Sequence, residues 1–554
     1  MKIGYSFLPV LLAGLAMPTL GQDEGRSARS AAKPVITQPE GAPVRDWLTW
    51  GYDAERTGWN RGETGLTPAN VSDLKLLWDA KVGTVPLDVS VATLTSPVVI
   101  ENVATPKGHK TVLFTIGSDS SFFAIDADSG NILWQKKYPN AIPPMRNANV
   151  NCPNTEQATP TIDKARGIVF FTTGDGKLHG LAVGTGAEKM KPQDMVAPYS
   201  RNWSLNFVNN VVYTAAGRGC GNGEPFEAGN VSAMDVSDLP HPQLSRFTTG
   251  HARSAGPWAR GGPVWGPEGV YVQTADGPYD PGAGIYGNAV VAVSSKAYGL
   301  ADSYSDANNA YLNSKDLDFG AGSPVIFPLG KRTLLATGGK EGYVYVLDAD
   351  NLGGADHTKP FFKSPRYGND EQTYAGLGIW GGLSSALNAA GERMIYVPMW
   401  GPLAKDAPKF QYTNGDITHG AVMAFRVLPQ GGGITLDPLW TSPDLAVPDS
   451  VAVANGVVYA VQTGEQTTQH PDNPEGHGRA VAGGHAMTQD ELNKFRSTGV
   501  AQFTLYALDA ETGKPLYSSQ NALPSFTHFT EAVVAVDKVF LVSHDAHVYA
   551  FGLK

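Results

Sequence analysis

Cysteine is nearly absent from this chain, whose 554 residues include two, Cys152 and Cys220. Neither belongs to a Cys-x-x-Cys-His motif, which excludes a covalently attached c-type haem. No cysteine directly follows the apolar N-terminal stretch, which argues against a lipoprotein. In an exported chain a cysteine pair is more often bridged than free, so Cys152 and Cys220 are predicted to form a disulfide.

Charged residues are also scarce, at 17% of the chain, and the formal net charge is −10. The sequence contains no basic stripe of the kind that binds phosphates. Nucleic acid is therefore not an expected partner, and the charge indicates chiefly a soluble protein.

A long apolar run occurs only at the N-terminus. Lys2 precedes the apolar stretch Phe7–Leu20, and small residues stand before Gln22. This pattern is typical of a secretory signal, predicted over residues 1–21, with a flexible leader over residues 22–45. The run is short for a bilayer span, although an uncleaved anchor is the alternative. We therefore expect a periplasmic or secreted protein without a transmembrane span in its mature form.

Helical periodicity is weak, with one short candidate at Thr488–Phe495, whereas Gly and Pro are abundant at 64 and 39 residues. Residues 121–134 are the most informative stretch, because they predict a strand, an Asp-Ser-Gly turn and a second strand ending in Trp134. The form Ala-x-Asp-x-x-Ser/Thr-Gly-x-x-x-Trp returns at residues 507–517, with Tyr517 in the last place. A hairpin that recurs at long period predicts an array of similar sheets.

Eight copies of the hairpin can be aligned on a landmark aspartate or its substitute. The landmark positions are Asp126, Ala182, Asp235, Ser294, Asp348, Arg426, Asp509 and Gly552. The spacings suit four-stranded blades of about 40–50 residues that carry loop insertions. The last copy lacks an outer strand, and Leu74–Trp78 is an outer strand without a blade, so the two are expected to pair. We predict an all-β fold over residues 46–554, an eight-bladed β-propeller of four-stranded antiparallel blades closed by its terminal strands.

The longest connections are predicted to share one face of this propeller. Each one joins the second and third strands of a blade, and they span residues 217–230, 275–288, 398–420 and 462–502. In four-stranded blades these connections emerge beside the connections between blades. Functional residues are therefore expected on this face, which we call the site face.

The repeated hairpin resembles the tryptophan-docking repeat of quinoprotein alcohol dehydrogenases, propellers that bind pyrroloquinoline quinone (PQQ). Residues 50–60, with Trp-Gly-Tyr-Asp and Thr-Gly-Trp-Asn, are similar to the opening of that branch, and polyvinyl-alcohol-dehydrogenase-like members are the nearest relatives suggested. The resemblance implies an oxidoreductase that oxidises a small-molecule or polymeric alcohol by base-assisted hydride transfer to a metal-bound quinone. With no fused cytochrome c domain, electrons would leave through a separate acceptor such as a cytochrome c.

The resemblance also implies a base and a cation. Asp316-Leu-Asp318 precedes an inner strand where family members carry the catalytic aspartate, and we take Asp318 as the base and Asp316 as a metal ligand. In lanthanide-using relatives the first aspartate of such a pair is the base, so the assignment within the pair stays open. Lys340, in a glycine-rich turn, occupies the position of the family's Arg or Lys that faces the quinone.

Further positions match the family's metal ligands and aromatic floor. Glu224, favoured over Glu227, aligns loosely with the ligand glutamate, and Asp276 replaces the expected asparagine. Carboxylate oxygens suit Ca²⁺ or a lanthanide ion. Trp258 and Trp380, each before an inner strand, compete for the aromatic floor.

One departure from the family pattern concerns the cysteines. Methanol dehydrogenases of the family have a vicinal Cys-Cys ring, which this chain lacks. A Cys152–Cys220 bridge would clamp the rim of the site face without replacing that ring. The alternative function is a non-catalytic periplasmic propeller that serves as a binding or assembly scaffold. In that case the acidic residues would belong to ordinary turns and loops, Lys340 would be a solvated turn lysine, and the tryptophans would serve only core packing.

Overall fold

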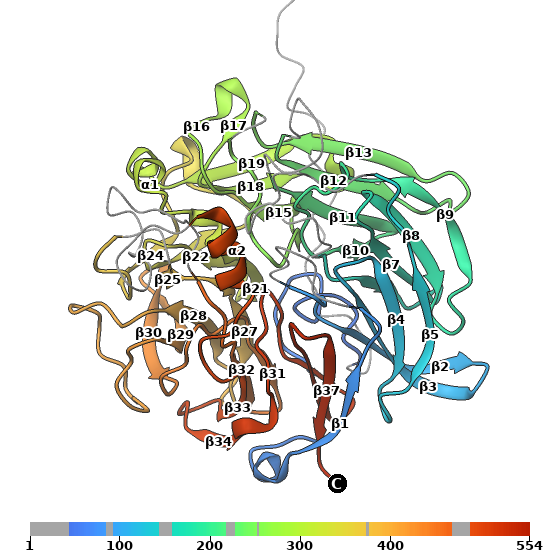
Figure 1. The fold of residues 1–554 in the computed structure, drawn as a ribbon. Coiled ribbons are helices and arrows are strands. Elements are labelled where there is room, and N and C mark those ends of the chain that lie inside the picture. The colour runs from blue at the N-terminus through green and yellow to red at the C-terminus, as the bar shows by residue number, and fades with distance from the viewer. Residues whose placement is uncertain are drawn as a thin grey trace, which may run out of the picture.

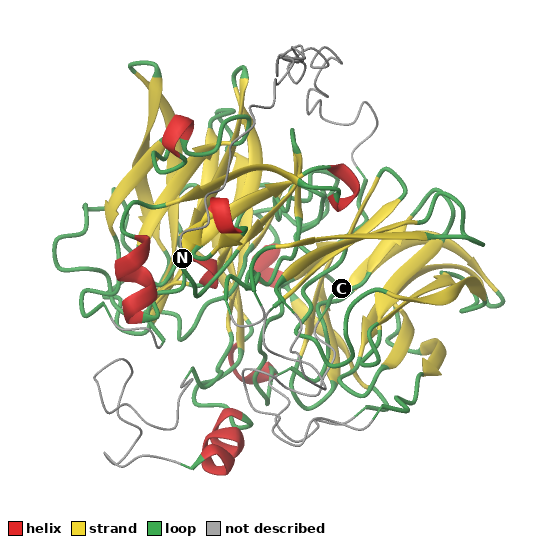
Figure 2. Ribbon diagram, turned by 90° about the horizontal axis from the view of Figure 1, so that it is seen from above, coloured by secondary structure: helices red, strands yellow, loops and turns green. Residues whose placement is uncertain are grey.

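The computed structural model describes residues 44–84, 92–142, 158–217, 228–251, 254–372, 376–467 and 488–554. These residues form eight antiparallel blades arranged around a central axis (Figure 1). The predicted eight-bladed propeller is confirmed. Strands dominate, and the few helices lie in the connections between strands (Figure 2).

The first four blades follow the chain from residue 98 to residue 305. Blade 1 contains β2 (Val98–Thr105), β3 (Gly108–Ile116), β4 (Ser121–Asp126) and β5 (Ile132–Lys137). Blade 2 contains β6 (Thr161–Asp163), β7 (Ile168–Thr172), β8 (Lys177–Ala182) and β9 (Glu188–Asp194). Blade 3 contains β10 (Asn206–Val208), β11 (Val211–Ala216), β12 (Asn230–Asp235) and β13 (Gln243–Thr248). Blade 4 contains β14 (Val264–Gly266), β15 (Gly269–Gln273), β18 (Ala289–Val293) and β19 (Leu300–Ser305), with a small hairpin of β16 (Tyr279–Asp280) and β17 (Ile285–Tyr286).

The other four blades complete the ring. Blade 5 contains β21 (Val325–Leu329), β22 (Arg332–Gly338), β23 (Tyr343–Asp348) and β24 (Phe362–Arg366). Blade 6 contains β27 (Ser384–Leu387), β28 (Arg393–Trp400), β29 (Gly420–Gln430) and β30 (Gly433–Thr441), and β25 (Gly378–Ile379) also pairs with β28. Blade 7 contains β31 (Ala452–Ala454), β32 (Val457–Gln462), β33 (Thr504–Asp509) and β34 (Pro515–Ser518). Blade 8 contains β35 (Val533–Ala535), β36 (Lys538–Val542), β37 (His547–Gly552) and β1 (Lys75–Lys81).

Short elements link blades near the hub. Strands β20 (Gly322–Ser323) and β26 (Gly381–Gly382) pair in parallel, whereas the blades are antiparallel. Two α-helices are described, α1 (Asn309–Lys315) and α2 (Gln489–Arg496). The sequence predicted α2 and missed α1. Among the described residues, no helix combines the length and apolarity needed to cross a bilayer.

The ring closes as the sequence predicted. β1 pairs antiparallel with β37, so the first and last strands of the described chain share blade 8. The pairing brings Trp78 opposite Ala550 and supplies the outer strand that this blade would otherwise lack. Closure therefore removes two unpaired sheet edges.

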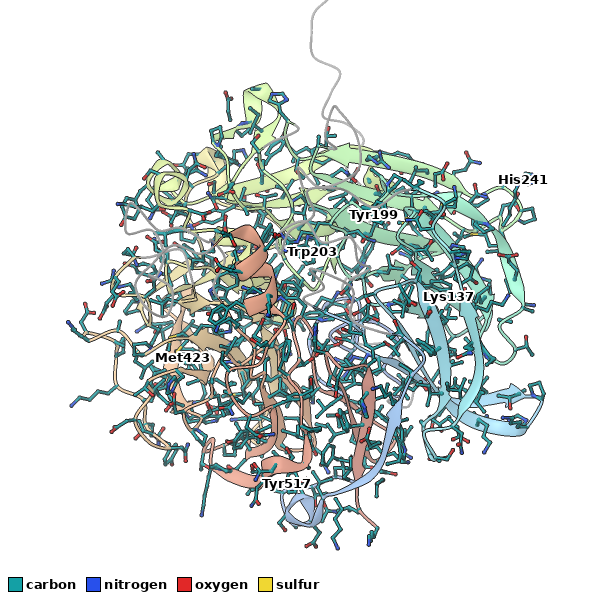
Figure 3. The ribbon with its side chains drawn as sticks, in the orientation of Figure 1. Lys137, Tyr199, Trp203, His241, Met423 and Tyr517 are labelled. Carbon is teal, nitrogen blue, oxygen red and sulfur yellow. The ribbon has the colours of Figure 1, made fainter. Side chains whose placement is uncertain are left out.

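Middle strands and outer strands differ in burial. All six residues of β4 are buried, whereas the outer strand β5 contains only exposed and half-buried residues. A middle strand is covered on both faces by neighbouring blades and therefore reads as a continuous apolar run. Trp203 lies near the centre of the ring, and Lys137 and His241 lie on its outer side (Figure 3).

Each repeat tryptophan joins one blade to the next. The indole N–H of Trp134, in blade 1, donates to the carbonyl oxygen of Val183 in blade 2 at 3.1 Å. A Cβ on Gly186, in the same turn of blade 2, would come within 2.8 Å of the Trp134 ring. The Thr-Gly turn of one blade thus needs glycine because the tryptophan of the preceding blade packs on it.

A segment that we call the N-terminal clasp, residues 47–60, binds the inner strand of every blade. It makes main-chain or side-chain hydrogen bonds at the first or second residue of each inner strand, in blade order. The partners are Val99, Ile162, Asn206, Trp265, Ile326, Ser385, Val453 and Val534. The clasp therefore runs around the hub and ties all eight blades together.

Asn60 ends the clasp, and its replacement by alanine is expected to destabilise the ring. Its fully buried amide accepts from the N–H groups of Gly62 and Glu63 and donates to the carbonyl oxygens of Arg45 and Val534. Loss of these bonds leaves buried backbone groups unpaired, at a cost of about 2–3 kcal/mol.

Calorimetry of Asn60→Ala should therefore show a lower melting temperature than the wild type. The matched control is Asn131→Ala, because Asn131 is exposed and bonds only within its own turn. Equal melting temperatures for the two variants would contradict a role of the clasp in stability.

Candidate functional site

Three carboxylates meet on the site face at the hub. Oxygen atoms of Asp276, Asp316 and Asp318 all lie within 4.8 Å of one another. In the described part of the chain, this is the one such group of acidic, histidine or cysteine ligands. The sequence predicted these three residues as neighbours, and the structure brings them together.

Helix α1 places the Asp-x-Asp pair. Asp316 is the C-cap of α1 and has a left-handed backbone (φ 53°), and its N–H donates to Leu312 O. The chain then turns, and Asp318 begins a 3₁₀ turn at Phe319–Ala321. The N–H of Phe319 donates to the side-chain oxygen of Asn288, at 2.9 Å. The pair is therefore fixed by a helix end on one side and by blade 4 on the other.

Blade 5 supplies the cation. The Lys340 ammonium contacts the Asp318 carboxylate, lies 3.8 Å from Asp316 Oδ1, and donates to Asp316 O at 3.1 Å. The backbone N–H of Lys340 donates to the backbone carbonyl oxygen of Asp318 at 3.1 Å. A Cβ on the preceding Gly339 would come within 2.8 Å of Asp318 O and Phe319 Cα. Glycine at 339 is therefore what lets the turn approach the aspartate loop.

Burial and charge set the protonation of this group. Burial raises the pKa of Asp318 to about 6, with Asp276 adding to the rise and Lys340 opposing it. Burial alone lowers the pKa of Lys340, but the attraction of Asp316, Asp318 and Asp276 outweighs it, and the pKa is raised overall. Near neutral pH the site therefore holds a protonated lysine beside an aspartate that is mostly ionised and can accept a proton.

Both predicted tryptophans lie beside this cluster. Trp380 is stacked on Trp400, with ring centroids 4.5 Å apart and planes inclined by 5°, and the Lys340 ammonium lies 5.3 Å from its ring centre. Half-buried Trp258 packs against the loop after Asp318. The approach is so close that a Cβ added at Gly320 would come within 3.0 Å of the Cβ of Trp258. The structure thus brings one tryptophan close to Lys340 and the other close to the loop that carries Asp318.

Three buried arginines at the hub were missed from the sequence. The Arg201 guanidinium lies 4.1 Å from the Trp258 ring centre, and Arg260 pairs with Asp449. Burial, reinforced by Arg496 and Arg260, lowers the pKa of Arg201 to about 9, and burial with Arg260 lowers that of Arg496 to about 10. A signal existed, because Arg201 and Arg260 precede inner strands just as Trp258 and Trp380 do.

A second buried acid–base pair lies near these arginines. His528 contacts Glu465 through Nδ1, and both side chains are at least 97% buried. Burial, with Arg260 and Arg201, holds the pKa of His528 well below its usual range, so the imidazole is neutral. Trp50 of the N-terminal clasp reaches the same region, because Cβ atoms on Gly261 and Gly382 would meet its ring. The clasp therefore packs against the segments of the hub that contain Gly261 and Gly382.

Two sequence-predicted features cannot be placed. Glu224, with its alternative Glu227, and the cysteine pair Cys152 and Cys220 lie outside the described residues. The signal segment and nearly all of the predicted leader lie outside them as well. These assignments stay predictions.

Comparisons with known proteins support the fold. Residues 47–191 match the sequence profile of the family described as "Glucose/ethanol/alcohol dehydrogenase, beta-propeller domain", the PQQ repeat. This part of the chain is therefore similar to the PQQ-repeat family, and the described residues as a whole have an eight-bladed propeller fold. Curated proteins include no sequence match to it.

Solved quinoprotein structures share the architecture at low identity. The quinohemoprotein alcohol dehydrogenase ADHIIG from Pseudomonas putida HK5 has a TM-score of 0.57 and 15% identity, over 92% of this chain and 80% of that chain. The corresponding enzyme from Comamonas testosteroni has a TM-score of 0.56 and 16% identity, over 92% and 81%. A europium-containing methanol dehydrogenase has a TM-score of 0.57 and 14% identity, over 91% and 89%. At these identities the similarity is one of fold.

Proposed function

We propose that the protein is an exported PQQ-dependent oxidoreductase that oxidises an alcohol. The observation that carries the proposal is the contact of Lys340 with Asp318, within a cluster completed by Asp276 and Asp316. A buried lysine, hard oxygen ligands and a base of raised pKa are three of the parts that this chemistry needs.

The residues present fit an anionic planar cofactor and a hard metal ion. Asp276 and Asp316 would hold Ca²⁺ or a lanthanide ion beside the base Asp318, because the oxygens of all three carboxylates converge within 4.8 Å. Trp258 or Trp380 would support the flat ring, and the buried arginines favour negative charge beside it. The chemistry that these groups supply when bound is a two-electron acceptor and a Lewis acid.

The chain's own residues would handle the proton. Ionised Asp318 would take the hydroxyl proton of the alcohol on a carboxylate oxygen. Protonated Lys340 holds Asp318 in place through their direct contact and would stabilise negative charge that develops nearby. Asp316, whose side chain is 37% exposed, is better placed as a ligand than as a base that works away from water.

Turnover is expected to rise with pH as Asp318 ionises. The pKa of Asp318 is about 6 without a metal ion, and a cation bound beside the carboxylate lowers it. Lys340 stays protonated throughout, because its pKa is raised above 10.5. Steady-state rates of the metal-loaded holoprotein should therefore rise at pH 6 or below, and rates that fall as pH rises through this range would contradict Asp318 as the base.

Reconstitution tests the proposed function directly. The purified protein is incubated with PQQ and either Ca²⁺ or La³⁺, and quinone absorbance, melting temperature and dye reduction with a panel of alcohols are measured. We expect a bound-quinone spectrum, a higher melting temperature and dye reduction with at least one alcohol. No cofactor binding with either metal would refute the proposal, and binding without turnover would favour a scaffold.

A further inference from the structure

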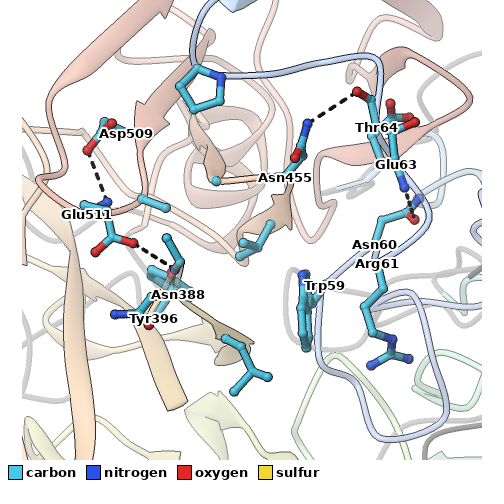
Figure 4. Close-up of a pocket in the computed structure, with 16 residues that line it drawn as sticks. Trp59, Asn60, Arg61, Glu63, Thr64, Asn388, Tyr396, Asn455, Asp509 and Glu511 are labelled. Carbon is cyan, nitrogen blue, oxygen red and sulfur yellow. Dashed lines mark hydrogen bonds between the residues drawn. The ribbon is translucent and has the colours of Figure 1, made fainter. Parts of the chain in front are cut away.

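A cavity lies on the face opposite the candidate site. It has a volume of about 510 Å³ and is lined by the end of the N-terminal clasp and by turns of blades 6 and 7 (Figure 4). The turns at residues 387–389 and 455–456 join first and second strands, and the turn at 509–511 joins third and fourth strands. Connections of these kinds emerge away from the site face, so the cavity is separate from the carboxylate cluster.

Most polar groups of the lining are used by their own turns. Asn388 bonds Glu392 and two backbone N–H groups, and Glu63 accepts from Gly65 and Asp537. Asn60 is also fully used in the clasp. These side chains build the wall and leave little capacity for a ligand.

The groups that remain are mainly acceptors. Glu511 accepts from the Ala389 N–H through Oε1, and Asp509 uses Oδ1 for its turn. Among the described residues, Glu511 Oε2, Asp509 Oδ2 and Asn455 Oδ1 accept no hydrogen bond. Three acceptors, two of them carboxylate oxygens, require a ligand that brings donors and positive charge.

Two aromatic side chains complete the cavity. Tyr396 is 1% exposed and lines the cavity, and its hydroxyl bonds no other described residue. Half-buried Trp59 stands edge-on in Figure 4, and Arg61, which also lines the cavity, lies 5.4 Å from its ring centre. Arg61 is paired with Asp53 at 3.0 Å, so its charge is partly neutralised. An aromatic face beside carboxylates attracts an organic cation.

We propose that this cavity binds an organic ammonium group between Trp59 and the carboxylates of Asp509 and Glu511. An ammonium carries three donors and no acceptor, which matches the acceptor-rich wall. A metal ion fits less well, because the converging acidic group in the described residues is the one at Asp276, Asp316 and Asp318. The assignment does not depend on the proposed PQQ chemistry.

Calorimetric titration of the full chain with butylammonium chloride tests the proposal, with neutral butyramide and CaCl₂ as comparison ligands. We expect saturable butylammonium binding that Trp59→Leu and Glu511→Gln each weaken about tenfold. Glu188→Gln, an exposed carboxylate elsewhere, and Asp318→Asn, in the other cluster, should leave the affinity unchanged.

The same titrations can overturn the assignment. It fails if butyramide binds as tightly as butylammonium, or if Ca²⁺ displaces butylammonium from the Asp318→Asn protein. It also fails if Glu511→Gln, which keeps the side-chain shape, has wild-type affinity.

Discussion

Asp318→Asn is expected to reduce alcohol turnover by about 10²–10⁴-fold in the reconstituted protein, the usual contribution of a positioned general base. Asparagine keeps the shape of the side chain but cannot take a proton. The amide also retains an oxygen that the Lys340 ammonium can contact, so the local structure should persist. Quinone absorbance should therefore remain while dye reduction is lost.

The comparison variant is Asp316→Asn, two residues earlier in the same loop. Asp316 lies 3.8 Å from the Lys340 ammonium and is partly exposed, so its loss should weaken metal binding more than the chemical step. Saturating metal should then restore turnover in Asp316→Asn and not in Asp318→Asn. The opposite pattern would exchange the roles of the two aspartates.

Lys340→Met is expected to destabilise the fold by about 3–5 kcal/mol at pH 8, the usual cost of removing one partner of a buried ion pair. Lys340 is fully buried and is the cation that contacts Asp318 and lies within 4 Å of Asp316. Methionine fills most of the same volume, so the loss reports charge rather than packing. The melting temperature measured by calorimetry should fall by several degrees.

The pH dependence of this loss distinguishes charge from packing. The folded-state pKa of Asp318 is about 6, above the ordinary 3.8, so folding favours its protonated form, and ionisation costs stability as pH rises through this window. Without Lys340 that cost grows, so the difference from wild type should be larger at pH 8 than at pH 5. Lys340→Arg keeps the cation and is the control. An equal loss at both pH values would indicate packing alone.

The position of the carboxylate site could be predicted from the sequence because the repeats show which connections between strands lie on the same face. Once the hairpin at residues 121–134 defines which connections share a face, Asp276, Asp318 and Lys340 follow from their places between strands. The structure confirms that they meet. The roles of these residues remain proposals, because a common face shows that side chains lie close together and does not show which reaction they carry out.

Other parts of the hub could not be predicted, for physical reasons. Helix α1 is seven residues long and mostly polar, so it has no apolar periodicity to detect. The positions of Arg201 and Arg260 before inner strands indicate the hub, but their burial could not be predicted, since burial of a charge depends on partners distant in the chain, such as Asp449 for Arg260. The contact of Glu465 with His528 joins different blades and leaves no local pattern.

The N-terminal clasp also affects how the protein can be made. Residues 47–60 are synthesised first, yet two of their partners, Val453 and Val534, belong to blades 7 and 8. Domains commonly begin to fold from the N-terminus during synthesis, but here the clasp finds its last partners only after blade 8 has been synthesised. A polypeptide that stops short of blade 8 would leave the clasp partly unbound and β1 without its neighbour. The closed ring thus depends on blade 8, and products that end before it should remain open to proteolysis.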